Sequence, residues 1–105
     1  HTMLDLIGML QYPVIMVCTT GLGAINDAML SIMALHGIGA SIAGIVYNGM
    51  PTAPDPIAVD NVRTIARLSK LPTLAVIHRL PAPVTPEALA EAFAEFAWKP
   101  LLPQA

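Results

Sequence analysis

The chain has 105 residues, of which 55% are hydrophobic and only 11% are charged, and its formal net charge at pH 7 is −2. This length fits one small domain, and the apolar content indicates that part of its surface meets a partner. The sequence has no cluster of Lys and Arg, which argues against binding to nucleic acid or anionic lipid, because both require a positive field.

Several features of the sequence indicate the cellular compartment of the protein. The single cysteine, Cys18, cannot form an internal disulfide and ends the apolar run 13–18, so a reducing cytoplasm is expected. Residues 28–54 contain no Asp, Glu, Lys or Arg, but Gly37-Ile38-Gly39 divides them into a helix and a short β-branched segment, which argues against a membrane span. A signal peptide is not expected either, since Asp5 lies where basic residues would stand.

The amino-terminal elements are predicted to be a helix and a strand. Thr2 can cap a helix that ends near Gln11, with Asp5 close to its positive end. Residues 13–17 form a continuous, β-branched apolar run, which is typical of a strand covered on both faces. Residues 19–23 are expected to form the following loop.

A second helix and a second strand follow this loop. Apolar residues recur at helical spacing from Ala24 to Leu35, and Gly37 is expected to end that helix in a left-handed turn. Residues 41–47 are apolar and partly β-branched, which predicts a strand, and Asn48-Gly49 is expected to end it in a turn.

The remaining chain predicts a third helix, a third strand and a last helix. Asp55 can cap the third helix with Pro56 at its first position, and its inward residues are expected to be Ile57, Val62, Ile65, Ala66 and Leu68. Pro72 prevents the helix from continuing, residues 73–77 predict a buried strand, and Thr85-Pro86-Glu87 begins the last helix.

The alternation of helices and strands predicts an α/β fold. Strands connected by helices are parallel, the crossovers are right-handed, and the helices lie on both faces of the sheet. Three parallel strands that are apolar on both faces leave at least one hydrophobic edge open to pairing. The chain is therefore predicted to be part of a larger, doubly wound parallel sheet, with residues 1–99 in the domain and residues 100–105 in a flexible tail.

The loops that follow the strands are the predicted binding region, because ligands bind at the carboxyl edge of a parallel sheet. In the first loop, two glycines precede a helix, where free backbone N–H groups suit a carboxylate or phosphate, although a simple tight turn is the alternative. This loop lacks both the Gly-Lys-Ser/Thr ending of a phosphate loop and the third glycine of a dinucleotide fingerprint.

The second and third loops offer groups that suit a nucleotide. The carboxamide of Asn48 can match the N6 and N7 edge of adenine, although an ordinary Asn-Gly turn is the alternative. The proline-bearing segment 77–83 can form a wall beside adenine, with Glu87 as an acceptor for ribose, although Arg79 can equally be a solvated charge. No pair of histidines or carboxylates has metal-ligand spacing and no serine lies on a nucleophile elbow, so neither a metal site nor a catalytic dyad is predicted.

Five segments of the chain resemble dethiobiotin synthases in order and spacing, and together they extend over nearly its whole length. These segments are residues 2–7 (TMLDLI), 13–17 (PVIMV), 21–26 (GLGAIN), 43–48 (AGIVYN) and 74–81 (LAVIHRLP). Related phosphate-loop amidoligases, such as the cobyrinic acid synthases, are the nearest alternative family.

The resemblance implies a homodimeric, magnesium-dependent ligase of biotin biosynthesis with a P-loop NTPase-like fold. Such an enzyme converts 7,8-diaminononanoate, CO2 and ATP to dethiobiotin, ADP and phosphate. The resemblance assigns the binding of the substrate carboxylate, in the site of the neighbouring subunit, to Leu22, Gly23, Ala24, Ile25 and Asn26. It assigns nucleotide binding to Asn48, His78, Arg79, Leu80, Pro81 and Glu87.

The sequence also departs from the family pattern. Asp27 stands where a histidine is usual, and His78 stands where a proline is usual. The phosphate loop, the catalytic lysines and the magnesium-binding acids belong to the family's amino-terminal half, which this sequence lacks, so the chain alone is not expected to catalyse. A non-catalytic dimerisation or binding module is the alternative to an enzyme half.

Overall fold

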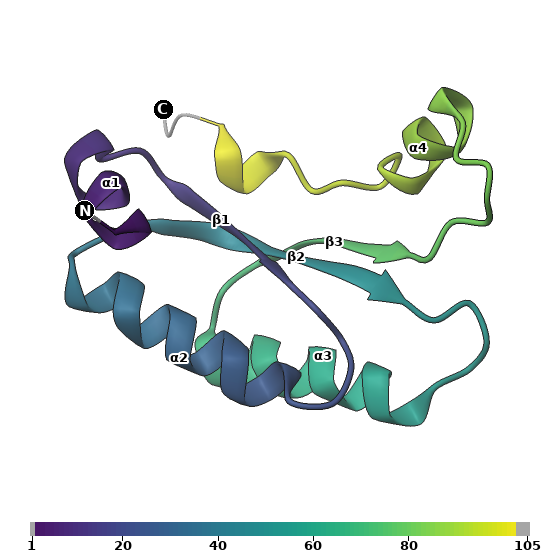
Figure 1. Cartoon of the computed structure of the whole chain (residues 1–105), viewed down its shortest axis with the longest axis horizontal. Helices are drawn as coiled ribbons and strands as arrows, with labels where there is room; N and C mark the ends of the chain where they lie inside the picture. The colour runs from purple at the N-terminus through teal and green to yellow at the C-terminus, as the bar shows by residue number, and fades with distance from the viewer. Residues whose placement is uncertain (1, 103–105) are drawn as a thin grey trace.

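The computed structural model, which describes residues 2–102, has a three-stranded parallel sheet with helices on both faces (Figure 1). The strands are β1 (Val14–Cys18), β2 (Ile42–Met50) and β3 (Thr73–His78), in the order β1-β2-β3. The helices are α1 (Met3–Leu10), α2 (Ala24–Gly37), α3 (Pro56–Ser69) and α4 (Pro86–Ala92), followed by the 3-10 turn η1 (Lys99–Leu101). The predicted α/β fold with parallel strands is therefore confirmed.

The main core lies between the sheet and the pair α2 and α3, which pack against each other on one face (Figure 1). Its fully buried side chains include Ile45, Tyr47 and Ile65. A smaller cluster of Val46, Leu74 and Ile77 lies apart from this core, and residues of α4, η1 and the segment between them pack against it. Burial of apolar surface on both sides of β2 explains why its sequence is apolar without alternation.

Helices α1, α3 and α4 begin where the sequence predicts, because each has a side chain that satisfies free backbone N–H groups, whereas α2 begins after Gly23 without a side-chain cap. Thr2 and Asp5 form a reciprocal capping box at α1. The Asp55 carboxylate accepts from the Ile57 and Ala58 amides at 3.0 and 3.1 Å. The Thr85 hydroxyl accepts from the Ala88 amide at 3.1 Å.

Three local predictions are wrong in detail. Gly37 is still helical, and Gly39, with a φ of 73°, takes the left-handed conformation after α2. Strand β2 does not end at Asn48-Gly49 but continues to Met50 through a register irregularity, with Gly49 at a φ of 85°. Within α3, Ala58 and Ile65 are buried while Ile57 and Leu68 are exposed.

The carboxyl-terminal segment follows β3 and includes a short helical turn. Helix α4 ends at Ala92, and the chain then passes along β3, where the Ala97 amide donates to the Leu74 carbonyl at 2.7 Å. Residues 99–101, two of which fall in the predicted flexible tail, form η1, and Leu101 packs against the smaller core cluster. Residues 103–105 of that tail lie outside the described part of the chain.

Strand β1 has one open edge. Its inner edge pairs with β2, and the Val14 amide donates to the Ser41 carbonyl at 2.8 Å. Since alternate residues of a strand direct their N–H groups to the same side, the amides of Ile15 and Val17 point to the outer edge. No strand pairs with that edge among residues 2–102, and the side chains of Ile15 and Val17 are 42% and 67% exposed. The structure therefore has the unpartnered apolar edge that the sequence predicts.

Candidate functional site

The three loops predicted to converge do so at the carboxyl edge of the sheet. They enclose a cavity of about 510 Å³, which we call the loop cavity. Residues 19–22 line it from the first loop, Asn48, Gly49, Pro51 and Asp55 from the second, and Arg79 from the third. The geometry follows from parallel pairing, because all three strands end on the same side.

The first loop is fixed by a residue that the sequence analysis did not identify. The Asn61 side chain, on α3, donates from Nδ2 to the carbonyl oxygens of Thr20 and Gly21 at 2.8 and 3.0 Å. Thr20 is almost fully buried at the base of the loop. The spacing of Asn61 in the sequence could have identified it. Asn61 lies three residues after Ala58 and four before Ile65, which places its carboxamide on the buried face of α3.

The start of α2 leaves several backbone amides available, as expected of a helix amino terminus. The Ala24 amide donates to the Gly21 carbonyl at 3.1 Å, and the Asp27 amide donates to the Gly23 carbonyl at 3.0 Å. In the described chain, the amides of Leu22, Gly23, Ile25 and Asn26 have no backbone or side-chain acceptor. Of the five residues predicted to bind the substrate carboxylate, Leu22 lines the loop cavity, and buried Ala24 has its amide engaged in the turn.

Asn48 and Arg79 both line the loop cavity. Asn48 is exposed near the end of β2, and its pairing partner in β3 is Ile77. The loop that follows β3 is held against β2, because the Arg79 amide donates to the Met50 carbonyl at 2.9 Å. The structure thus brings these two predicted nucleotide-binding residues together.

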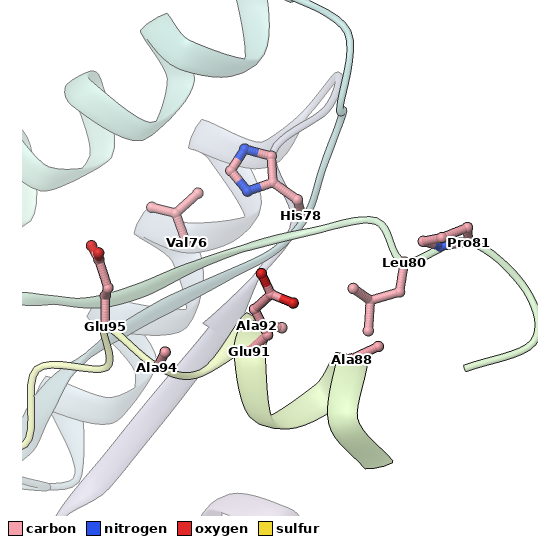
Figure 2. Close-up of a pocket in the computed structure, with 9 residues that line it drawn as sticks. All are labelled: Val76, His78, Leu80, Pro81, Ala88, Glu91, Ala92, Ala94 and Glu95. Atoms are coloured by element: carbon pink, nitrogen blue, oxygen red, sulfur yellow. The ribbon is translucent and has the colours of Figure 1, made fainter. Parts of the chain in front are cut away.

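The neighbouring residues of the third loop belong to a second cavity, which we call the β3 cavity (Figure 2). This cavity has a volume of about 770 Å³, and His78, Leu80 and Pro81 line it together with Glu91 and Glu95. In Figure 2, the carboxylate of Glu91 points from α4 toward the strand end that carries His78. Within residues 2–102, Glu87 lines neither of these two cavities. The predicted nucleotide-binding residues are therefore divided between two places.

The two cavities differ in charge. In the loop cavity, the positive charge comes from Arg79, and the carboxylate of Asp55 already accepts two hydrogen bonds from α3. The β3 cavity carries two glutamates and one histidine. Phosphate groups are attracted to cations and repelled by carboxylates, so the loop cavity is the better place for them.

Two further features of the described residues concern the Cys18 thiol and the grouping of possible metal ligands. Burial raises the pKa of the Cys18 thiol, so this buried cysteine remains protonated at neutral pH and is a poor nucleophile. Residues 2–102 contain no group of three or more His, Cys, Asp or Glu side chains that are placed to hold a metal ion. No helix among the same residues is long and apolar enough to cross a membrane.

Comparisons with known proteins agree with the motifs. A family model described as an AAA domain matches residues 1–88. The chain is 33% identical over 94 residues to the ATP-dependent dethiobiotin synthetase of Nitrobacter hamburgensis, a match to 90% of this chain and 41% of that protein. It is 39% identical over 80 residues to the Bacillus subtilis synthetase, covering 76% of this chain and 34% of that protein.

A third relative, the synthetase of a Janthinobacterium species, is 38% identical over 101 residues, covering 96% of this chain and 42% of that protein. The chain thus spans about two fifths of the length of the relatives it matches. These matches confirm the resemblance that the five motifs indicate. The chain belongs to the AAA-domain family, and over about nine tenths of its length it is similar to ATP-dependent dethiobiotin synthetases.

Proposed function

We propose that this chain is the carboxyl-terminal part of an ATP-dependent dethiobiotin synthetase acting in the cytoplasm. In this role it recognises adenine, supplies part of the substrate-carboxylate site and contributes a dimer surface. The observation that carries the proposal is the loop cavity, in which Asn48, Arg79 and the glycine loop before α2 meet. Similarity to synthetases over 90% and 76% of this chain supports the same reaction.

Adenine recognition is assigned to Asn48. Its carboxamide has one acceptor and two donor hydrogens, which can pair with the amino group and a ring nitrogen of adenine together. The exposed side chain lies where β2 leaves the sheet, so a base can approach it from solvent. Arg79, on the same cavity wall, is suited to the phosphate groups.

The carboxylate of 7,8-diaminononanoate is assigned to the amides at the start of α2. Leu22, Gly23, Ile25 and Asn26 have amides without a protein acceptor in the described structure, and the helix dipole adds a favourable potential there. Apolar side chains are exposed at Leu22, before α2, and at Leu30 and Met33, within it. Exposed apolar side chains on the helix that follows a binding loop support a homodimer in which this surface completes the partner's site.

The phosphate loop and the magnesium site are assigned to a further segment, in the same chain or in a separate one. The open edge of β1 supports this assignment, because an unpaired apolar strand edge is suited to accept another parallel strand. The described residues do not gather the carboxylates that Mg²⁺ requires, so this chain's own part in the reaction is to bind and orient. ATP then phosphorylates the substrate carbamate before the second amine closes the ring.

The experiment that tests adenine recognition is the substitution Asn48→Ala in the complete synthetase. We expect kcat/KM for ATP to fall by about fivefold to tenfold while GTP changes little, since each lost hydrogen bond contributes about 0.5–1.5 kcal/mol. The measurement is the initial rate of dethiobiotin formation with ATP, GTP and CTP.

Two further variants sharpen this test. Asn48→Asp removes the donors and keeps acceptors, so it should favour guanine, whose N1 and N2 groups both donate, over adenine. As a matched control, Gly23→Ala should raise KM for diaminononanoate and leave the base preference unchanged, because a side chain at a φ of 81° strains the loop that holds the assigned amides. If base preference is unaltered in both Asn48 variants, adenine is not recognised in the loop cavity. The β3 cavity would then be the candidate adenine site.

A further inference from the structure

Asn61 makes a contact of a kind that no other side chain in residues 2–102 makes. Its Nδ2 donates to the carbonyl oxygens of Thr20 and Gly21, which lie 41 and 40 positions away in sequence. Every other side-chain hydrogen bond of the described chain joins residues two or three positions apart. One carboxamide therefore connects α3 to the loop that precedes α2.

This contact determines how the loop presents its amides. In a planar trans peptide the C=O group and the following N–H group point in opposite directions. Because the Thr20 and Gly21 carbonyls both point at Asn61, the amides of Gly21 and Leu22 must point away from α3. The Gly21 carbonyl also accepts from the Ala24 amide at 3.1 Å, so the same bond holds the turn that opens α2.

The loop has little else to fix it. Gly21 and Gly23 have open space around them, and Gly23, at a φ of 81°, takes a conformation that side chains rarely adopt. Glycine backbones lose more entropy on ordering than other residues, so a loop with two glycines is mobile unless it is held by hydrogen bonds. Asn61 supplies two such bonds from a rigid, 14-residue helix.

We propose that Asn61 is a positioning residue, which holds the glycine loop so that its amides are ready for an anionic group of the substrate. The inference rests on the proposed function, in which this loop binds the carboxylate of diaminononanoate. Asn61 contacts the loop and not the substrate, so it affects substrate binding only through the position of the loop. A preorganised loop binds a ligand more tightly, because the loop has already lost its conformational entropy before the ligand binds.

The test is Asn61→Asp in the complete synthetase. The aspartate has nearly the same shape but directs a carboxylate at two carbonyl oxygens, so it repels the loop where asparagine holds it. We expect KM for diaminononanoate to rise by about 10-fold or more, since two hydrogen bonds are lost, with kcat and KM for ATP changed less than about twofold. The matched control is Asp60→Asn, at the adjacent exposed position of the same helix, which should leave both KM values unchanged.

A second readout does not depend on activity. In ¹⁵N relaxation measurements on the same protein, the amides of Gly21, Leu22 and Gly23 should have lower order parameters in Asn61→Asp than in the parent, because the loop moves more when it is not held. Titration with acetate should move these signals less in the variant. Failure of the parent protein to make dethiobiotin would refute the proposed function while leaving this readout intact.

The possible outcomes separate positioning from a purely structural role. A selective rise in KM for diaminononanoate together with lower order parameters in the loop supports the proposal. A lower melting temperature with both KM values unchanged, or equal loss of affinity for both substrates, would overturn it. Unchanged order parameters at residues 21–23 would overturn it as well, because the bonds from Asn61 would then not hold the loop.

Discussion

Residues 1–105 alone are expected to form no detectable dethiobiotin from diaminononanoate, CO2 and ATP. The described residues contain neither a phosphate loop nor a metal cluster, and the loop cavity offers binding groups but no group that activates the carbamate. Addition of a segment that carries Gly-x-x-x-x-Gly-Lys-Ser/Thr, in the same chain or as a separate one, should raise the rate by more than about 10³-fold. Removing even one preorganised donor to a developing anion costs about 10²–10³ in rate, and the whole phosphate-binding loop contributes several.

The control for this experiment is the same segment with its phosphate-loop lysine changed to alanine. The altered segment should form a complex of the same mass as the intact segment does, and that complex should be inactive. This control distinguishes a loss of assembly from a loss of catalysis. Synthesis of dethiobiotin by residues 1–105 alone would contradict the assignment of catalysis to another segment. Assembly with the intact segment but no activity would favour the alternative of a non-catalytic binding module.

The substitution Gly44→Val is expected to lower the free energy of unfolding by about 3 kcal/mol, which is the upper range for overpacking a core. A Cβ atom at position 44 would lie 2.7 Å from Leu74 Cγ and 2.9 Å from the Pro72 carbonyl oxygen. That oxygen cannot easily move, because it accepts from the Ile45 amide at 2.9 Å and so joins β2 to the start of β3. Urea denaturation followed by circular dichroism measures the change.

The matched control is Gly8→Ala, inside α1. A Cβ atom at position 8 meets nothing within 4 Å, so this change should stabilise the protein by about 0.5–1 kcal/mol through helix propensity. The two glycine substitutions should therefore have opposite signs. Equal and small effects would mean that β2 and β3 are not as closely packed at Gly44 as the structure has them.

The elements of the fold can be predicted because their signals are local. Thr2, Asp55 and Thr85 each satisfy amides within three residues, so the sequence alone shows where helices begin. The end of β2 cannot be predicted in this way. Asn48-Gly49 has the composition of a turn, but pairing with β3 extends the strand to Met50, and such pairing outweighs a local preference.

The sequence predicts where the candidate site lies, but it predicts less well which residues line each cavity and which contacts hold the loops. Parallel strands bring the three loops together, and this follows from the order of elements. The division of the third loop between two cavities follows from the geometry of an extended chain, in which neighbouring side chains point in opposite directions. Accordingly, Arg79 lines the loop cavity while His78 and Leu80 line the β3 cavity. The contact of Asn61 with Thr20 depends on tertiary packing across 41 positions, so helical spacing places Asn61 on the buried face of α3 but does not specify its partner.

In the complete synthetase, β1 is expected to be an interior strand of a larger sheet. Hydrogen exchange of its amides tests this claim directly. The amides of Met16 and Cys18 point to β2, whereas the amides of Ile15 and Val17 point to the edge that is open here. If another strand pairs with β1, all four amides should be strongly protected. Fast exchange of Ile15 and Val17 beside slow exchange of Met16 and Cys18 would contradict the claim.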